Sequence, residues 1–268
     1  MKKILAMLLV LSMVFALAAC GAKEEAPAAP VEEPAAEAPV EEAPVEEAPA
    51  EEEVAVMTHE EFVAAELDSK VCVETYVQAK QGWWNDQVTV YTQAEDGAYF
   101  LYNMPCTEAQ NEELTVGTKI RVTGWKAEWS GEVEITEAEF EIIEGNYVAE
   151  AAELNELLGT EELIAHQNEL VKFTGLTVVA SVDAEGNEAP FLYGWDGSGE
   201  EGTDADLYFT LTDGTNNYTF VIEYYLNGGS DVYAAVQALE VGQVVDVEGF
   251  LYWYDGMQPH VTALTVVG

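Results

Sequence analysis

Short segments of alternating apolar and polar residues fill the chain beyond residue 54. Because successive side chains of a β-strand point to opposite faces, this alternation predicts strands with one buried face. Asp-Gly pairs at 96–97 and 213–214 predict hairpin turns, one in each half of the chain. The predicted strands span 70–80, 88–91, 98–104, 119–128 and 132–143 in the first half, and 170–180, 207–212, 218–223, 243–254 and 257–267 in the second.

Two polar links interrupt the strand pattern, at 107–113 and 230–239, and each is predicted to contain a short helix. Each half also opens with a threonine followed by acidic residues, at Thr58 and at Thr160. A threonine oxygen can accept a hydrogen bond from the first N–H groups of a helix, and acidic side chains suit its positive end. Both threonines therefore predict helix starts.

The two halves of this region repeat one another. Leu114-Thr115-Val116-Gly117 recurs as Leu239-Glu240-Val241-Gly242, and similar turn residues follow each copy. The second copy is the longer one, and most of its extra residues lie in a segment rich in Gly, Asp and Glu. Self-similarity of this kind indicates a duplicated structural unit. The predicted domains are 57–146 and 147–268, the second with a loop insertion at 183–206.

Three strands, a helical link and two further strands make up the order of the OB fold, a small Greek-key barrel. Each half resembles that fold in its element order, in the Leu-x-x-Gly motif before the fourth strand and in its hairpin signals. The resemblance covers nearly all of residues 58–268. It implies an all-β protein of two five-stranded OB-like Greek-key barrels joined by short linking helices.

The first residues carry a targeting pattern. Met1-Lys2-Lys3 is positively charged, and Ile4 to Ala19 follow without a charge, a run that is short for a membrane-spanning helix. The run ends in Leu17-Ala18-Ala19-Cys20-Gly21, which resembles the bacterial lipobox. The resemblance implies a signal peptide over 1–19, cleavage before Cys20 and a diacylglyceryl thioether on that cysteine. The alternative is an ordinary signal peptide in which Cys20 is incidental.

Residues 22–53 consist of 10 Ala, 12 Glu, 6 Pro, 3 Val and 1 Lys. Such a composition cannot bury enough apolar surface to offset the entropy of ordering, and its prolines favour extended conformations. At ~3.1 Å per residue the segment can reach on the order of 100 Å. We therefore expect 20–56 to be a disordered acidic tether behind the lipidated Cys20. A solubilising tail is a compatible alternative.

Taken together, these features resemble tandem OB-fold surface lipoproteins of Gram-positive bacteria. The resemblance implies a lipid-anchored protein on the extracytoplasmic face of the cell membrane.

Candidate ligand-binding residues come from the loops. OB barrels bind oligonucleotides and oligosaccharides on the face of strands two and three, between the one-two and four-five loops. Both loops are aromatic here, and exposed rings can stack on sugar faces. The alternative is that these rings pack over the barrel ends, although adjacent Trp83 and Trp84 cannot both point inward from an extended strand. The candidates are Trp83, Trp84, Trp125, Trp129, Tyr193, Trp195, Tyr252, Trp253 and Tyr254.

Charge was expected to separate the classes of ligand. The net charge is -42, with 9 Lys and Arg against 51 Asp and Glu. Phosphate binding requires clustered cations, so this balance predicts that nucleic acid is an unlikely partner. A neutral glycan or a cationic peptide fits the composition better. The one opening for nucleic acid is a local patch of Lys80, Lys119, Arg121 and Lys126, which more simply neutralise nearby acids.

Catalytic and metal-binding motifs are absent from the sequence. His59, His166 and His260 lie far apart, without Cys or His at metal-ligand spacing, and no nucleophile elbow, phosphate loop or dinucleotide motif occurs. We therefore expect no enzyme activity, metal site or cofactor. Cys72 and Cys106 can form a disulfide or remain buried thiols, and their places at opposite strand ends favour thiols. The acidic run 196–206 suggests calcium but departs from the EF-hand pattern, so a solvated loop is preferred.

The sequence thus predicts a non-enzymatic binding or adaptor protein, with neutral glycan or envelope polymer bound through the aromatic loops. The first alternative is a protein–protein interaction module accessory to a transporter or secreted enzyme. The second is nucleic-acid binding by analogy with other OB folds.

Overall fold

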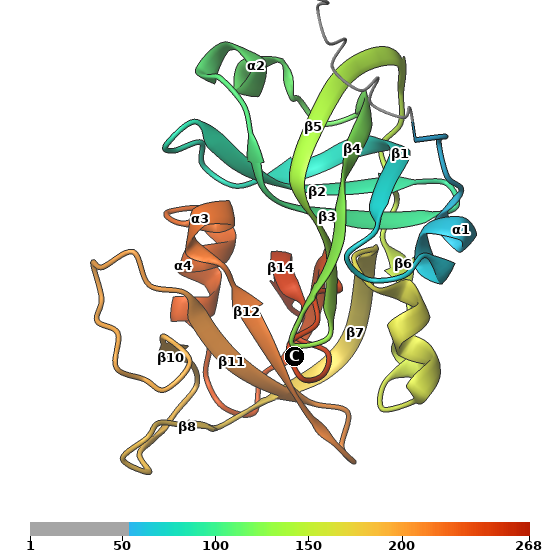
Figure 1. Ribbon diagram of the computed structural model, residues 1–268. Coiled ribbons are helices and arrows are strands. Elements are labelled where there is room, and N and C mark those ends of the chain that lie inside the picture. The colour runs from blue at the N-terminus through green and yellow to red at the C-terminus, as the bar shows by residue number, and fades with distance from the viewer. Residues whose placement is uncertain (1–53) are drawn as a thin grey trace, which may run out of the picture. The chain divides into compact units, whose positions relative to one another are not determined.

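A computed structural model describes residues 54–268 of the chain (Figure 1). The expected signal peptide, the lipidated Cys20 and the tether up to residue 53 lie outside the described residues. The described residues belong to one compact unit.

The first half folds into a closed barrel of five strands in the order β1-β2-β3-β5-β4. Its third and fifth strands run parallel, with Phe100 beside Glu134, and this pairing closes the barrel. Val71, Val90 and Ile120 are among the fully buried core residues. The elements are α1 (His59–Ala64), β1 (Lys70–Lys80), β2 (Gln87–Ala94), β3 (Gly97–Pro105), α2 (Glu108–Glu113), β4 (Thr118–Trp129) and β5 (Glu132–Asn146).

The second half repeats this ring. β7 pairs with β11, and β11, β12, β14 and β13 follow in turn before β13 pairs with β7 again. The parallel closure recurs between Val221 and His260. The elements are β6 (Ala152–Glu153), η1 (Asn155–Leu157), η2 (Glu161–His166), β7 (Leu170–Val179), β8 (Ser181–Val182), β9 (Glu188–Ala189), β10 (Leu192–Tyr193), β11 (Leu207–Thr212), β12 (Asn217–Ile222), α3 (Tyr224–Asn227), α4 (Asp231–Gln237), β13 (Val244–Phe250) and β14 (His260–Val266).

The predicted fold class is therefore confirmed: the described part of the chain is mostly β, with two five-stranded OB-like rings and short helices. The strands follow the alternation of the sequence closely, because each ring has an apolar interior that selects one face of every strand.

The two predicted helix starts differ. Thr58 begins α1 with a reciprocal capping box, in which its hydroxyl accepts from Glu61 N and Glu61 accepts from Thr58 N. Thr160 precedes only a 3-10 helix, and its hydroxyl donates back to the carbonyl of Leu157 at 2.8 Å. A helical segment thus follows the threonine in both places, but only Thr58 caps an α-helix.

The outer face of strands two and three of the first barrel is covered by the second barrel. Tyr91 and Phe100 lie opposite each other on β2 and β3, and the Tyr91 ring stacks on Phe250 at 4.6 Å between centroids. The Tyr91 hydroxyl lies 2.7 Å from His260 Nδ1. Burial lowers the pKa of His260 to about 3, so this imidazole is neutral and can accept the tyrosine proton.

A second contact joins the two hairpin tips. Asp255 N donates to Ser130 O at 2.7 Å, and the Trp253 ring packs on Gly131. A Cβ at position 131 would lie 2.8 Å from Trp253 Cδ1, and the φ of +91° also disfavours other residues there. The turn at Ser130-Gly131 between β4 and β5 therefore also serves as a docking point.

None of the helices between residues 54 and 268 has the length and apolar composition needed to cross a bilayer.

Candidate functional site

The structure divides the aromatic candidates of the first barrel into inward and outward rings. Trp83 is half-buried against the core, and its Nε1 donates to Cys106 O at 2.9 Å. Trp84, the next residue, is 60% exposed. Trp125 and Trp129 are exposed on β4. Trp83 is thus a packing residue, and the other three rings face solvent.

The candidates of the second barrel divide similarly. Tyr193 and Trp253 pack against the core, and Tyr193 Oη accepts from Gln237 Nε2 at 2.9 Å. Tyr252 stacks on His260 at 4.2 Å between the two barrels. Trp195 and Tyr254 are 76% and 46% exposed, and these two line one pocket.

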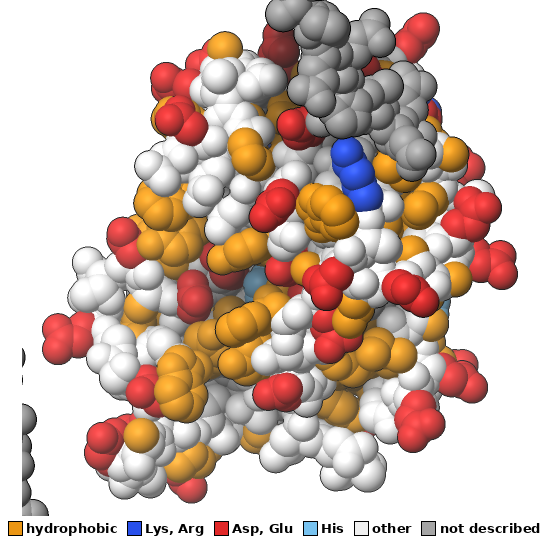
Figure 2. All heavy atoms as spheres, in the orientation of Figure 1, with side chains coloured by type: hydrophobic (Ala, Val, Ile, Leu, Met, Phe, Trp, Pro, Cys, Tyr) orange, Lys and Arg blue, Asp and Glu red, His pale blue; other side chains and the backbone are white. Residues whose placement is uncertain are grey.

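That pocket, which we call the ring pocket, has a volume of about 500 Å³. It lies over the outer face of β11 and β12, and Figure 2 shows apolar side chains gathered over these strands among scattered acidic ones. Trp195 and Tyr254 are candidates from the sequence, whereas Tyr208, Thr219 and Gln258 are not. The signal was present, because outward strand positions next to two aromatic loops are the expected floor of such a site. The pocket is lined by Trp195, Tyr208, Thr219, Tyr254 and Gln258.

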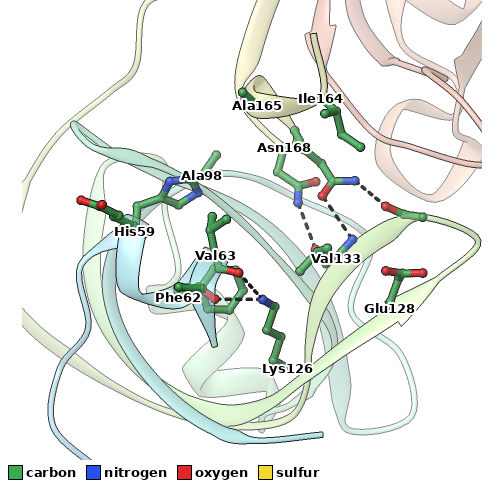
Figure 3. Close-up of a pocket in the computed structure, with 14 residues that line it drawn as sticks. His59, Phe62, Val63, Ala98, Lys126, Glu128, Val133, Ile164, Ala165 and Asn168 are labelled. Carbon is green, nitrogen blue, oxygen red and sulfur yellow. Dashed lines mark hydrogen bonds between the residues drawn. The ribbon is translucent and has the colours of Figure 1, made fainter. Parts of the chain in front are cut away.

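A larger depression lies between α1, the β4–β5 hairpin and η2 (Figure 3). This α1–η2 groove has a volume of about 690 Å³. Val63 of α1 and Ile164 of η2 line it and are 60% and 48% exposed. The sequence does not predict the groove, because two of its walls are six-residue helices, too short for a hydrophobic period to specify their packing. The adjacent apolar residues Phe62 and Val63 do indicate an exposed apolar side chain here, because a short helix on a surface can bury only one of two neighbours.

Lys126 crosses the floor of the groove but does not present its charge to it. Its Nζ donates to the carbonyl oxygens of Phe62, Val63 and Ala65 at 2.8–2.9 Å, as Figure 3 shows for the groove residues. Three donors thus meet carbonyls at the end of α1, of which Phe62 O also accepts from Ala65 N at 3.2 Å. Burial lowers the pKa of Lys126. The charged side chains on the groove rim are Glu60 and Glu128.

The other three cations of the expected patch also have partners. Lys80 Nζ donates to the backbone and side-chain oxygens of Asn111. Lys119 and Arg121 both bind Glu74, at 2.6 and 2.8 Å, and Arg121 also binds Glu141. These hydrogen bonds lower the pKa of the Glu74 carboxyl. All four cations lie on the neighbouring strands β1 and β4, and each is engaged by oxygen atoms of the first barrel.

Where the barrels meet, Glu132 is fully buried. Its Oε2 accepts from Trp253 N at 2.8 Å, whereas Oε1 and the nearby Asn168 Oδ1 have no partner among the described residues. Burial raises the pKa of Glu132 to about 8. A protonated Glu132 carboxyl is therefore the form that this site favours at neutral pH.

Metal binding finds no support in the described residues: no three His, Cys, Asp or Glu side chains among residues 54–268 gather closely enough to hold an ion. Cys72 and Cys106 are both buried and free. The acidic run 196–206 includes an ordered turn, in which Gly194 N donates to Asp206 O and Ser198 N to Asp196 Oδ1.

Comparison with protein-family models and with curated proteins finds no match. Among solved structures, the chain is similar to a murine DNA-binding protein bound with double-stranded DNA, at 11% identity over 74% of this chain and 96% of that chain, with a TM-score of 0.35. It is similar to the Ifi202 HINa domain in complex with a 20-base-pair duplex, at 12% identity over 74% and 98%, with a TM-score of 0.34. A third is Replication Protein A bound to single-stranded DNA, at 12% identity over 74% and 48%, with a TM-score of 0.29.

These comparisons correct two expectations from the sequence. Neutral glycan was preferred as the ligand and nucleic acid was held to be an unlikely partner, whereas the similar structures are described as DNA complexes. Net charge is an average over the chain and does not describe any one binding face, so net charge alone does not decide the class of ligand. Of the nine candidate rings, four pack inside or between the barrels, as the alternative in the sequence analysis allowed.

Proposed function

We propose that the protein is an extracytoplasmic, lipid-anchored and non-enzymatic adaptor that binds a protein partner through the α1–η2 groove. The observation that carries this proposal is an apolar groove whose rim charges are all negative. Exposed Val63 and Ile164 offer it apolar surface that the fold itself leaves uncovered. Exposed apolar patches rimmed by polar residues mark interaction sites.

The chemistry of the groove specifies the partner. Lys126 keeps its positive charge, but its ammonium group is buried and points at the carbonyls of α1. The two carboxylates of Glu60 and Glu128 outnumber it, so the charges that line the groove are negative on balance. A segment with aliphatic side chains flanked by Lys or Arg would fill the groove and neutralise its rim. An acidic partner would be repelled.

A pair of synthetic peptides tests this proposal on the compact unit that begins at Glu51. We expect a fluorescent peptide of alternating Leu and Lys to bind, and the same peptide with Glu in place of Lys to bind at least about tenfold more weakly. Val63→Ser with Ile164→Ser should weaken binding by a similar factor. The matched control is Val148→Ser with Val182→Ser, which removes exposed valines outside the groove.

Two results would overturn the proposal. One is equal binding of both peptides, which would mean a contact without the expected charge preference. The other is retention of affinity in the Val63/Ile164 variant. Direct binding of an oligonucleotide that the Val63/Ile164 variant loses would instead assign the site to nucleic acid.

The lipid anchor is a separate part of the proposal and needs its own test. The lipobox-like sequence before Cys20 supports it. In a bacterial host, the full chain should incorporate a labelled fatty acid and fractionate with membranes, and Cys20→Ser should lose both properties. Labelling of the serine variant would place the lipid elsewhere.

A further inference from the structure

The ring pocket brings together side chains from three separate segments of the second barrel. Tyr208 and Thr219 come from β11 and β12 and form its floor. Trp195 comes from the inserted segment before β11, and Tyr254 and Gln258 come from the connection between β13 and β14. The insertion that lengthens the second copy thus supplies one wall of this pocket.

The exposed rings are held by backbone hydrogen bonds. Gly194 N donates to Asp206 O and Gly199 N to Tyr193 O, both at 2.8 Å, which fixes the turn that carries Trp195 beside β11. On the other side, Tyr254 N donates to Gly256 O at 2.8 Å and Gln258 N to Tyr252 O at 2.9 Å. A large ring kept in solvent by a fixed backbone is available to a ligand without prior rearrangement.

Two carboxylates extend the same strand face. Tyr208 pairs with Val221 and Leu207 with Ile222, so the next outward pair along the strands is Asp206 and Glu223. Both carboxylates act on the Tyr208 hydroxyl. Burial, then Asp206 and more weakly Tyr254 and Glu223, raise the pKa of this hydroxyl to about 12.

These carboxylates have no cation to balance them in the described structure. Burial raises the pKa of Asp206, and burial together with Asp206 raises that of Glu223 to about 7. Glu223 Oε2 is buried and has no hydrogen-bond partner among the described residues. The single lysine or arginine of the second half, Lys172, lies 3.3 Å from Glu248 instead.

We propose that the ring pocket binds an organic cation that carries a trimethylammonium group, with the rings of Trp195, Tyr208 and Tyr254 around it and Asp206 and Glu223 beside it. The negative faces of aromatic rings attract a cation that is too bulky and too weakly hydrated to be held by a small oxygen site. Asp206 and the ionised fraction of Glu223 lie outside the pocket lining and add attraction from a distance, and a bound cation would favour the ionised form of Glu223. Gln258 and Thr219 can hydrogen-bond a hydroxyl on the same ligand. This site is separate from the α1–η2 groove and does not depend on it.

Calorimetric titration of the unit from Glu51 onward with choline tests the charge requirement. We expect saturable binding with a dissociation constant below about 10 mM. The neutral isostere 3,3-dimethylbutan-1-ol has the same shape without the charge and should bind at least about tenfold more weakly. Equal binding of the two would overturn the proposal, because an apolar pocket would then suffice. No saturable binding of choline would overturn it as well.

Side-chain variants test the place of binding. Trp195→Ala and Tyr254→Ala should each weaken choline binding at least about fivefold, and Asp206→Asn should weaken it in the same direction. The control is Trp129→Ala, which removes an exposed ring of the first barrel. Choline affinity that survives the first two variants, or falls equally in the control, would refute the assignment.

Two further probes separate the possible sources of the cation. Tighter binding of a trimethyllysine peptide than of choline would assign the pocket to a modified protein side chain, and the reverse order to a free small molecule. Binding of an oligothymidylate at the same rings, without any choline binding, would replace the proposal with base stacking.

Discussion

Tyr91 and Tyr208 occupy the same position in the two barrels but have opposite surroundings. Tyr91 lies opposite Phe100, which lies beside Glu134 of the fifth strand. Tyr208 lies opposite Val221, which lies beside His260 of the equivalent strand. Tyr91 is 1% exposed beneath the second barrel, whereas Tyr208 lines an open pocket.

This difference shows how a repeated fold can use one surface for two purposes. In the first barrel the face of strands two and three is an assembly surface. In the second barrel the same face remains accessible, and the insertion with Trp195 encloses it on one side. Fold alone therefore does not say which face binds a ligand.

A second pair of equivalent residues differs in charge. Lys126 and Leu251 follow matching glycine-aromatic pairs and make matching backbone bonds, to Ser69 and Asp68 in one barrel and to Glu169 and Asn168 in the other. Lys126 closes α1 with its ammonium group, whereas Leu251 joins the apolar core. The first barrel has an α-helix before its first strand, where the second has the 3-10 helices η1 and η2.

Removal of the covered ring should have the largest effect. Tyr91→Ala empties a fully buried position and leaves His260 Nδ1 without its partner, so we expect a loss of about 3–5 kcal/mol in the free energy of unfolding. Tyr208→Ala is the matched control and should cost about 1 kcal/mol or less, because its ring already borders solvent. Urea denaturation measures both. Equal losses would mean that the two faces do not differ as described.

The next effect concerns Glu132 at the junction of the barrels. Its pKa is raised from the usual 4.5 to about 8 in the folded protein. Its protonation therefore stabilises the fold below about pH 4.5, and this contribution is lost as pH rises through 8. Glu132→Gln should be more stable than the parent by roughly 2–4 kcal/mol at pH 9 and about equal at pH 4.

Denaturation at several pH values checks this prediction. Glu128→Gln removes an exposed carboxylate of the same hairpin and serves as the control. A constant difference between Glu132→Gln and the parent across the pH range would contradict the assigned titration.

A smaller loss should follow Lys126→Met, which keeps the length of the side chain and removes its three donors. The carbonyls of Phe62, Val63 and Ala65 then lose their partner, and we expect a cost of about 1–3 kcal/mol. Hydrogen exchange should accelerate over α1 but not over η2. Lys70→Met, at an exposed lysine, is the control, and unchanged protection of α1 would refute the role of Lys126.

The smallest effect belongs to an exposed ring. Trp84→Ala should change stability by no more than about 0.5 kcal/mol, since its side chain is mostly in solvent. Trp83→Ala should cost about 2–4 kcal/mol, because that ring packs on the core and bonds Cys106 O. Similar losses for the two neighbours, read from urea midpoints, would show that Trp84 also packs.

The strands could be predicted from the sequence because a barrel interior imposes period-two burial on every strand. The predicted ends of 70–80 and 207–212 agree with β1 and β11 to within a residue. The site was less accessible to such reasoning. Tyr91 and Tyr208 sit in similar local patterns, and their difference arises from docking between barrels, which no local pattern contains.

The environments of charged residues could not be predicted for the same reason. Lys126 reads as one of four surface cations, yet its partners are backbone carbonyls more than sixty residues earlier in the chain. Glu132 reads as one acid among many, but its burial follows from contact with Trp253, on the far side of the repeat. The identity of a residue is local information, whereas its protonation and availability depend on the assembled structure.

The cover over Tyr91 also fixes a stoichiometry. A tandem of two open barrels would offer two equivalent sites on the faces of strands two and three, with saturation at two equivalents. Here one of those faces is buried between the barrels and only the other is open. A ligand that binds this type of face should therefore saturate at one equivalent per chain.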